Sequence, residues 1–445
     1  MRWLLNLIYL MLLSLLAPVV LYRMIRHGRY RRGWRQRLLG KVKLPDSDKP
    51  RVWFHAVSVG EVVQLARVVD AFCDATDDRY EVIISVSTDT GYDLACRRMR
   101  DRTVIWFPLD FSWAVSRALR SITPSMVVLM ELEIWPNLIR TCTASSIPVV
   151  LINARMSARS AGGYQRISRL TRPLFEAFQF VAAQSQEHAD RLEQLGVDPE
   201  LLSVTGSVKF DGANTDRDND ATLGLKRLFG IGAQDLVVVA GSTQAPEEAT
   251  VLNAFRRLRS RHPELRLILV PRHQERFDEV AELIQKRGFQ VSRRSELGRR
   301  DNRQPPVDTG TVGLLDTIGE LQAGWGLADI AVVGGSFGVR GGQNMIEPAA
   351  YGAAPVFGTQ TWNFRDVVKL FRDNDACVEV PELQQLPQEL KLLVQDEVTR
   401  LRMGRRARAV VLANQGATQL TVDSLIRCLG HVEHTSVPAR TRRAA

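Results

Sequence analysis

The sequence contains few cysteines, and none of them belongs to a paired motif. The five residues are scattered between Cys73 and Cys428 with no C-x-x-C pair. This spacing excludes a disulfide framework and a cysteine-based zinc site, and it is typical of a protein from a reducing compartment. Glycine and proline, at 31 and 19 of 445 residues, are neither scarce nor enriched, which excludes a fibrous or disordered chain.

Acidic residues are missing from one segment. Residues 23–43 hold seven arginines and two lysines with no aspartate or glutamate, and they account for most of the formal net charge of +10. Such a segment could bind nucleic acid. The remaining charges nearly balance, however, and no recognisable nucleic-acid-binding module is present, so we expect no nucleic-acid partner.

An apolar run, WLLNLIYLMLLSLLAPVVLY at residues 3–22, lies directly before the basic segment. About 20 apolar residues suffice to cross a bilayer as a helix. A cleaved secretory signal is the alternative, but only Arg2 precedes the run, no small-residue cleavage site follows it, and the basic segment resists translocation. We therefore expect a transmembrane anchor at 1–22 and a basic juxtamembrane segment at 23–46, with the rest of the chain in the cytoplasm at the anionic membrane face.

Beyond residue 50, short apolar runs alternate with amphipathic stretches, as in βα units around parallel sheets. The candidate strands in the first half are 52–57, 81–87, 103–108, 126–130, 148–153 and 180–185. Those in the second half are 236–242, 266–271, 312–316, 330–335, 354–358 and 376–380. We expect two doubly wound α/β domains at 47–210 and 233–430, a turn-rich linker at 211–232 and a polar tail at 431–445.

Ligands of such sheets bind beyond the carboxyl ends of the strands, and a two-domain protein adds a cleft between its halves. Polar residues follow several candidate strands. They are Glu61, Glu133, Ser242 with Thr243, Arg272 with His273, and the stretch RGGQNMIEPAAYG at 340–352.

Each of these residues also has a purely structural interpretation. Glu61 could be a first-turn acid that favours the helix dipole, as could Glu320. Asn344 and Glu347 have the spacing of a capping box, with Asn344 at the N-cap. Lys209 differs from other surface lysines only by its place at the domain junction.

Two further motifs match known functional patterns, but the residues around them do not fit those functions. Residues 334–338 match the G-x-S-x-G nucleophile elbow of hydrolases, but Arg340-Gly341-Gly342 prolongs the loop where a helix should begin. The D-x-D pairs at 216–220 and 373–375 lie away from the predicted strand ends, so we expect no metal site.

Seven ordered motifs resemble one family over nearly the whole chain. They are VSVGE, ELEIWPNLI, INARMSARS, VTGSVKFD, AGSTQAPEE, LILVPRHQERF and ADIAVVGGSF followed by RGGQNMIEPAAYG. Together they resemble bacterial 3-deoxy-D-manno-octulosonic acid (Kdo) transferases. The resemblance implies a GT-B fold with two Rossmann-like domains and an N-terminal membrane anchor. It also implies metal-independent transfer of Kdo from CMP-Kdo to a lipid A precursor, lipid IVA, at the inner face of the bacterial inner membrane during lipopolysaccharide synthesis, with no cofactor.

The resemblance also implies roles for individual residues. Glu61 would be the general base, and Glu133 and Lys209 would stabilise the transition state. The CMP contacts would come from Pro271, Arg272, Ile318, Gly319, Glu320, Asn344, Met345, Ile346 and Glu347, with Ser242 and Thr243 as possible further donor contacts.

The chain departs from the family at a few positions. Gln244 and Gln343 stand where many members have histidine, and glutamine cannot take up a proton near pH 7. Leu132 replaces a common threonine. Two alternatives remain open: another membrane-associated GT-B transferase that uses a different nucleotide sugar, and a membrane-tethered binding protein in which Glu61 is only a helix-end acid.

Overall fold

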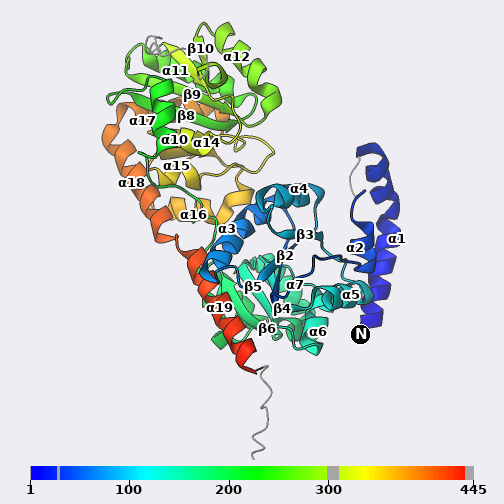
Figure 1. Ribbon diagram of the computed structural model, residues 1–445. Helices are drawn as coiled ribbons and strands as arrows, with labels where there is room; N and C mark the ends of the chain where they lie inside the picture. The colour runs from blue at the N-terminus through cyan, green and yellow to red at the C-terminus, as the bar shows by residue number, and fades with distance from the viewer. Residues whose placement is uncertain (1, 28–30, 298–309, 436–445) are drawn as a thin grey trace, which may run out of the picture. The chain divides into compact units, whose positions relative to one another are not determined.

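The computed structural model describes residues 2–27, 31–297 and 310–435. Contacts divide the chain into two units (Figure 1). Unit 1 comprises Met1–Asp211 and Gln415–Ala445, and unit 2 comprises Gly212–Asn414. Each unit contains one seven-stranded sheet.

The strands of unit 1 are all parallel. In spatial order they are β3 (Thr103–Trp106), β2 (Glu81–Val86), β1 (Arg51–Ala56), β4 (Pro124–Met130), β5 (Val149–Ala154), β6 (Phe178–Ala183) and β7 (Leu202–Val204). Successive side chains enter different cores. Val52 and Phe54 lie in one cluster, whereas Trp53 lies in the other. Because both faces are buried, these strands are continuous apolar runs.

Helices cover both faces of this sheet. Those of unit 1 are α1 (Arg2–His27), α2 (Trp34–Leu39), α3 (Val59–Ala75), α4 (Asp89–Arg98), α5 (Ser112–Ile122), α6 (Pro136–Ala144), α7 (Ala158–Arg166), α8 (Ser168–Phe175), α9 (Gln186–Gln194) and α19 (Ala417–Thr435). Residues of α3, α4 and α19 join the core on one face, and residues of α5, α6, α8 and α9 join the core on the other.

The strands of unit 2 are also parallel. In order they are β10 (Gln290–Arg293), β11 (Thr311–Leu314), β9 (Leu265–Pro271), β8 (Leu236–Thr243), β12 (Ile330–Val333), β13 (Ala354–Gly358) and β14 (Val378–Val380). The helices are α10 (Asp220–Leu228), α11 (Glu247–Arg259), α12 (Phe277–Lys286), α13 (Arg294–Leu297), α14 (Leu321–Trp325), α15 (Ile346–Ala350), α16 (Arg365–Asp373), α17 (Leu386–Gln395) and α18 (Glu397–Ala413).

The prediction of two doubly wound sheets is confirmed, and all twelve candidate strands overlap observed strands. Two strands were missed, β7 and β10. Both are short edge strands, and their side chains are mostly exposed or only partly buried. A strand of this kind lacks the apolar run by which the others are recognised.

The domain boundaries differ from the expected ones at the C-terminal end. The expected second domain extends to residue 430, but unit 2 ends at Asn414. Helix α19 instead returns to unit 1 and lies along α3 (Figure 1). Val422, Leu425 and Leu429 of α19 are buried in the unit 1 core. The expected linker contains α10, and the end of the expected tail, 436–445, lies outside the described residues.

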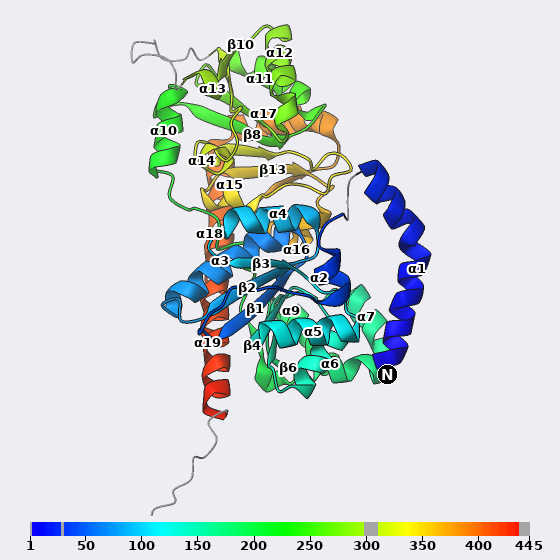
Figure 2. The same cartoon turned by 45° about the vertical axis from the view of Figure 1, so that its right-hand side comes forward.

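Helix α1 is long and apolar enough, over Trp3–Arg26, to cross a membrane by length and composition. Its N-terminal half lies beside α5 (Figure 2), and polar side chains connect it to the rest of unit 1. Asn6 Nδ2 donates to Ser112 Oγ at 2.7 Å, and the Tyr9 hydroxyl donates to Asp110 Oδ2 at 3.1 Å. These two polar residues therefore face the protein, while Leu7, Met11 and most other apolar side chains of α1 are exposed.

Candidate functional site

Both sheets have a point where the strand order reverses, and the candidate residues follow the strands on either side of it. In unit 1, β2 lies on one side of β1 and β4 on the other. Glu61 follows β1, and Glu133 follows β4. In unit 2, Thr243 ends β8, and Gly334 follows the neighbouring β12. The carboxyl ends of strands at such a switch point are the usual ligand site of open α/β sheets.

Glu61 lies in the first turn of α3, as its purely structural interpretation also has it. Ser58 is the N-cap, and Glu61 at position N3 completes a capping box. Glu61 Oε2 accepts from Val57 N at 2.9 Å. Its Oε1 accepts from Ser58 Oγ at 2.8 Å and from Ser58 N at 3.2 Å. The pKa of Glu61 lies above its ordinary value. Burial is the main cause and the negative charge of Glu131 adds to it, whereas the hydrogen bonds from Val57 and Ser58 act in the opposite direction.

Glu133 lies in a less favourable environment for a negative charge. Its Oε2 accepts one hydrogen bond, from Trp135 Nε1 at 2.9 Å. Burial raises the pKa of Glu133 to about 7, and the negative charges of Glu61 and Glu131 add to this effect. The structure thus brings Glu61 and Glu133 close enough for their charges to interact, because they follow the adjacent strands β1 and β4.

Glu131 is a third member of this carboxylate group, and the sequence did not predict it. It lies directly after β4 and has φ of +55°. A positive φ is unfavourable for a side chain of this type, and backbone strain of this kind gathers at functional sites. The motif ELEIWP contains both glutamates, but only the backbone geometry distinguishes the strained one.

Val208, the residue before Lys209, is connected to the Glu61 helix through two buried amide side chains. The fully buried Asn153 follows β5 residue Ile152 with φ of +51°, and its Oδ1 accepts from Val208 N at 3.3 Å. Asn153 Nδ2 donates to Gln64 Oε1 at 2.9 Å. Gln64 on α3 in turn donates to Gly60 O at 3.2 Å. The sequence pattern predicted neither amide, although Asn153 lies within the motif INARMSARS.

In unit 2, Glu247 connects the loops after β8 and β12. Its two carboxylate oxygens accept from Gly335 N at 2.9 and 3.0 Å, and Oε2 also accepts from Gln244 N at 2.9 Å. Ser242 has φ of +53°, and the Thr243 hydroxyl is buried without a hydrogen-bond partner among the described residues. Glu247 was not predicted, because its motif AGSTQAPEE gives no sign that it binds backbone amides.

The two glutamines that replace family histidines lie together. A Cβ atom added to Gly335 would meet Gln244 Nε2 at 3.2 Å and Gln343 Cγ at 3.3 Å. The two positions, 99 residues apart in sequence, therefore flank one glycine at the switch point. Because both side chains are neutral amides, neither can take up a proton here as a histidine could.

The expected CMP contacts lie on three separate loops of unit 2. Pro271 ends β9, and the Arg272 backbone N–H donates to Thr243 O at 3.0 Å, while the Arg272 side chain is exposed. Ile318 is 77% exposed, and Gly319 has φ of +92°. Glu320 pairs with Arg294 at 2.9 Å.

The expected capping box at Asn344 differs in the structure. The N-cap of α15 is Met345, and Asn344 Oδ1 accepts from Ile346 N at 3.0 Å. Asn344 Nδ2 donates to Glu347 Oε1 at 2.9 Å. The two side chains therefore bind each other instead of forming reciprocal bonds to the helix backbone. Met345 and Ile346 are buried in the unit 2 interior.

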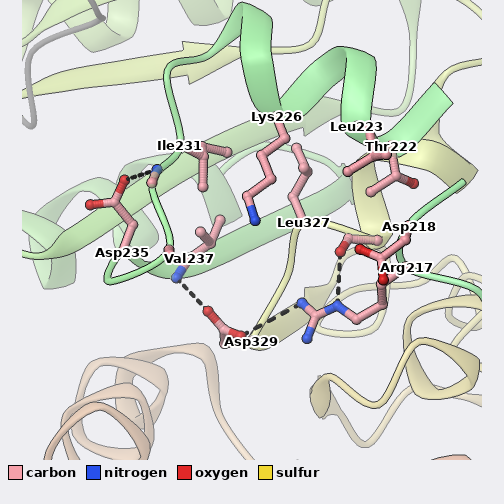
Figure 3. A pocket seen from close by; sticks show the side chains of 13 residues that line it. Arg217, Asp218, Thr222, Leu223, Lys226, Ile231, Asp235, Val237, Leu327 and Asp329 are labelled. Carbon is pink, nitrogen blue, oxygen red and sulfur yellow. Dashed lines mark hydrogen bonds and ion pairs between the residues drawn. The ribbon is translucent and has the colours of Figure 1, made fainter. Parts of the chain in front are cut away.

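A cavity of about 300 Å³ lies at the opposite edge of the unit 2 sheet (Figure 3). It is lined by residues around the amino ends of β8 and β12, including Val237 and Asp329. Asp329 accepts from Val237 N at 2.9 Å and pairs with Arg217. None of the predicted site residues lines this cavity. The two interactions of Asp329 join the loop before α10 to the sheet.

Similarity to known proteins supports one family. The family model for 3-deoxy-D-manno-octulosonic-acid transferase (kdotransferase) matches residues 32–212. A 3-deoxy-D-manno-octulosonic acid transferase of Haemophilus influenzae is 32% identical over 427 residues, covering 94% of this chain and 97% of the relative. The transferase of Bordetella pertussis is 32% identical over 440 residues, covering 95% and 99%.

Solved structures are similar in fold. UDP-GlcNAc 2-epimerase from Neisseria meningitidis bound to UDP-GlcNAc has a TM-score of 0.54 at 12% identity, covering 85% of this chain and 100% of that chain. The S. aureus MnaA-UDP co-structure has a TM-score of 0.53 at 14% identity, covering 88% and 100%. At such identities the likeness concerns the fold alone, which is the GT-B type.

Proposed function

Because the chain belongs to the 3-deoxy-D-manno-octulosonic acid transferase family, we propose that it transfers Kdo from CMP-Kdo to lipid IVA, a lipid A precursor. Kdo transfer in lipopolysaccharide synthesis is the activity that the family supports. The donor, the acceptor and the residue roles below are our proposal. The observation that carries the mechanism is the buried Glu61 carboxylate at the switch point of unit 1, next to Glu131 and Glu133.

Glu61 acts as the general base. The acceptor hydroxyl oxygen forms a bond to the anomeric carbon of Kdo, the bond from that carbon to the CMP phosphate oxygen breaks, and CMP leaves with the electron pair. The hydroxyl proton passes to Glu61. Three hydrogen bonds orient the carboxylate, and its raised pKa makes it a stronger base. General bases of this kind contribute roughly 10² to 10⁴ in rate.

The CMP moiety binds at the switch point of unit 2. The loops bearing Pro271 and Arg272, residues 318–320 and residues 344–347 are its contacts, with Ser242 and Thr243 beside them. The unpartnered buried hydroxyl of Thr243 supports this placement, because such a group costs stability unless it serves another purpose.

Fixed cations replace a metal ion in this mechanism. The phosphate of leaving CMP gains negative charge, and preorganised positive groups stabilise such charge in a water-poor site. Arg272 and Lys209 supply these cations. Activity should therefore survive excess EDTA, and a loss of activity that magnesium restores would contradict this assignment.

The acceptor is an anionic lipid, so the chain works at the cytoplasmic face of the inner membrane. Helix α1 provides the apolar attachment. The basic segment 23–46 adds attraction to anionic lipids, worth about 1 kcal/mol per Lys or Arg near the surface.

The decisive experiment is incubation of the purified full chain with CMP-Kdo and lipid IVA, followed by mass analysis of the lipid. A mass gain of one or more Kdo units is the expected result. The alternative of another nucleotide sugar is tested by thermal unfolding with CMP and UDP. We expect CMP at about 100 times its Kd to stabilise the protein by ~2.7 kcal/mol, and stabilisation by UDP alone would favour the alternative.

A further inference from the structure

A buried histidine faces Glu133. His55 on β1 is fully buried, and its ring stacks on Phe107 with centroids 3.7 Å apart. His55 Nε2 lies 3.9 Å from Glu133 Oε2 and has no hydrogen-bond partner among the described residues. Neither the family resemblance nor the sequence pattern around His55 gives it a role.

The hydrogen bonds of His55 determine its protonation. His55 Nδ1 lies 3.0 Å from the carbonyl oxygen of Ser85, which can only accept, and 2.9 Å from Ser85 Oγ. The Ser85 hydroxyl donates its own proton to the carbonyl oxygen of Phe54 at 3.4 Å, so it too accepts from Nδ1. Nδ1 therefore carries a proton. Burial lowers the pKa of His55 to about 3, so the ring is neutral at physiological pH. A neutral ring with Nδ1 protonated has a lone pair on Nε2, and this lone pair faces Glu133.

The other groups around Glu133 also disfavour a negative charge. Glu61 on α3 and Glu131 at the end of β4 both act on it as negative charges, and Trp135 supplies one neutral donor. Tyr164 on α7 is affected by the Glu133 charge and has a raised pKa, chiefly through burial, so it is neutral. Among the described groups that shift the Glu133 pKa, none is a cation.

We propose that Glu133 acts as a neutral carboxylic acid whose O–H donates a hydrogen bond to an anionic oxygen of a substrate, with His55 as the positioning residue that keeps the proton in place. Oε2 accepts from Trp135, so Oε1 carries the proton. This inference rests on the proposed function. The anionic oxygen is either the carboxylate of the donor sugar or a phosphate of the lipid acceptor. A charged Glu133 beside Glu61 and Glu131 would repel both.

The two carboxyl groups thus have different roles in the reaction. Glu61 receives three hydrogen bonds and remains a carboxylate that accepts a proton. Glu133 receives one and keeps its proton. Pairs of carboxyl groups with separated pKa values are a recurrent means of assigning acid and base roles in one site.

The first test detects the proton on Glu133 directly and does not require a measurement of Kdo transfer. In an infrared pH titration of the full chain, the wild type should show a protonated-carboxyl band that titrates near neutral pH and is absent from Glu133→Gln. The control Glu176→Gln changes an exposed glutamate of the same unit and should keep the band. If the band is absent from the wild type, or persists in Glu133→Gln, the proposal is wrong even if Kdo transfer is confirmed.

The second test is kinetic. Wild-type kcat/KM should fall about tenfold per pH unit above its alkaline pKa. Glu133→Gln, whose amide also donates, should lose this alkaline decline. An alkaline decline that persists unchanged in Glu133→Gln would overturn the proposal. A raised KM for CMP-Kdo alone in Glu133→Ala assigns the sugar carboxylate, and a raised KM for lipid IVA alone assigns the phosphate.

His55 is tested by His55→Phe, which keeps an aromatic ring against Phe107 and removes the lone pair. The alkaline limb of the wild-type pH profile should move to lower pH, because the charged form of Glu133 is no longer opposed by the Nε2 lone pair. A merely structural role would lower the activity without moving this limb. Thermal melting confirms that the variant is folded, and an unmoved limb in folded protein contradicts the role of His55.

Discussion

At the scale of single residues, two glutamates of one site differ because their hydrogen-bond donors differ. The main-chain amides and the cap hydroxyl around Glu61 are present because α3 begins at Val59. Glu133 lies in a loop and has one indole donor. The sequence predicted both residues from their places after strands. The sequence could not predict that His55 is their neighbour, because a histidine within an apolar strand is usually a core residue.

Glu61→Gln should lower Kdo transfer by at least about a hundredfold, because the amide cannot accept the acceptor's proton. The structure adds a stability cost of about 1–3 kcal/mol, since the amide NH₂ would face an N–H group that now donates to the carboxylate. The measurements are initial rates with CMP-Kdo and thermal unfolding. Ser58→Ala is the matched control. It should cost similar stability through the lost cap but far less activity, and a variant Glu61→Gln with near-normal transfer would refute the base assignment.

Gly334→Ala should destabilise unit 2 by about 1–3 kcal/mol through overpacking. A Cβ atom there would lie 2.6 Å from Ser242 O and 2.6 Å from Thr243 Cα, so two backbone segments would have to separate. Gly338→Ala is the control, because a Cβ atom there meets nothing within 4 Å. Chemical denaturation of both variants measures the difference, and equal midpoints would show that the loops adjust freely.

At the scale of elements, α19 packs in the core of unit 1, although it follows unit 2 in the sequence. Its sequence is amphipathic, and that pattern predicts a helix but not the sheet on which the helix packs. Gly416 N and Thr418 N both donate to Asp211, which ends the first segment of unit 1. The Asp211 carboxylate thus connects the two places at which the chain passes from one unit to the other.

Leu425→Ala should cost unit 1 about 2–5 kcal/mol, because the side chain is fully buried in a core shared with α3. Leu420→Ala on the same helix removes a side chain that is 52% exposed and should change stability by less than about 0.5 kcal/mol. Thermal unfolding followed by tryptophan fluorescence compares them. Equal effects would mean that α19 does not contribute to the unit 1 core in solution.

At the scale of the whole molecule, charge and apolar surface are concentrated at the N-terminal end. Residues 23–43 account for most of the net charge, and α1 exposes most of its apolar side chains. Because an exposed apolar helix of this length is unstable in water, a lipid environment is the expected partner.

The full chain should remain in the membrane fraction through a high-salt wash, since apolar attachment does not depend on ionic strength. A variant lacking residues 1–27 retains only the rest of the basic segment. It should bind anionic vesicles at low salt and be released at high salt, where the charges are screened. Vesicle sedimentation measures both. Recovery of the full chain in the soluble fraction without detergent would refute the membrane attachment.

The sequence by itself determined the local features of this protein: twelve of the fourteen strands, the apolar helix with its basic neighbour, and the glutamates at two strand ends. Each follows from a pattern within a few residues. The tertiary structure decided which distant residues meet: His55 with Glu133, Asn153 with Gln64, Gln244 with Gln343 around Gly335, and α19 with unit 1. Such pairings depend on strand order and on burial, which raises the pKa of Glu133 to about 7. Neither is a property of a local stretch of chain, since both arise only when the sheet brings distant segments together.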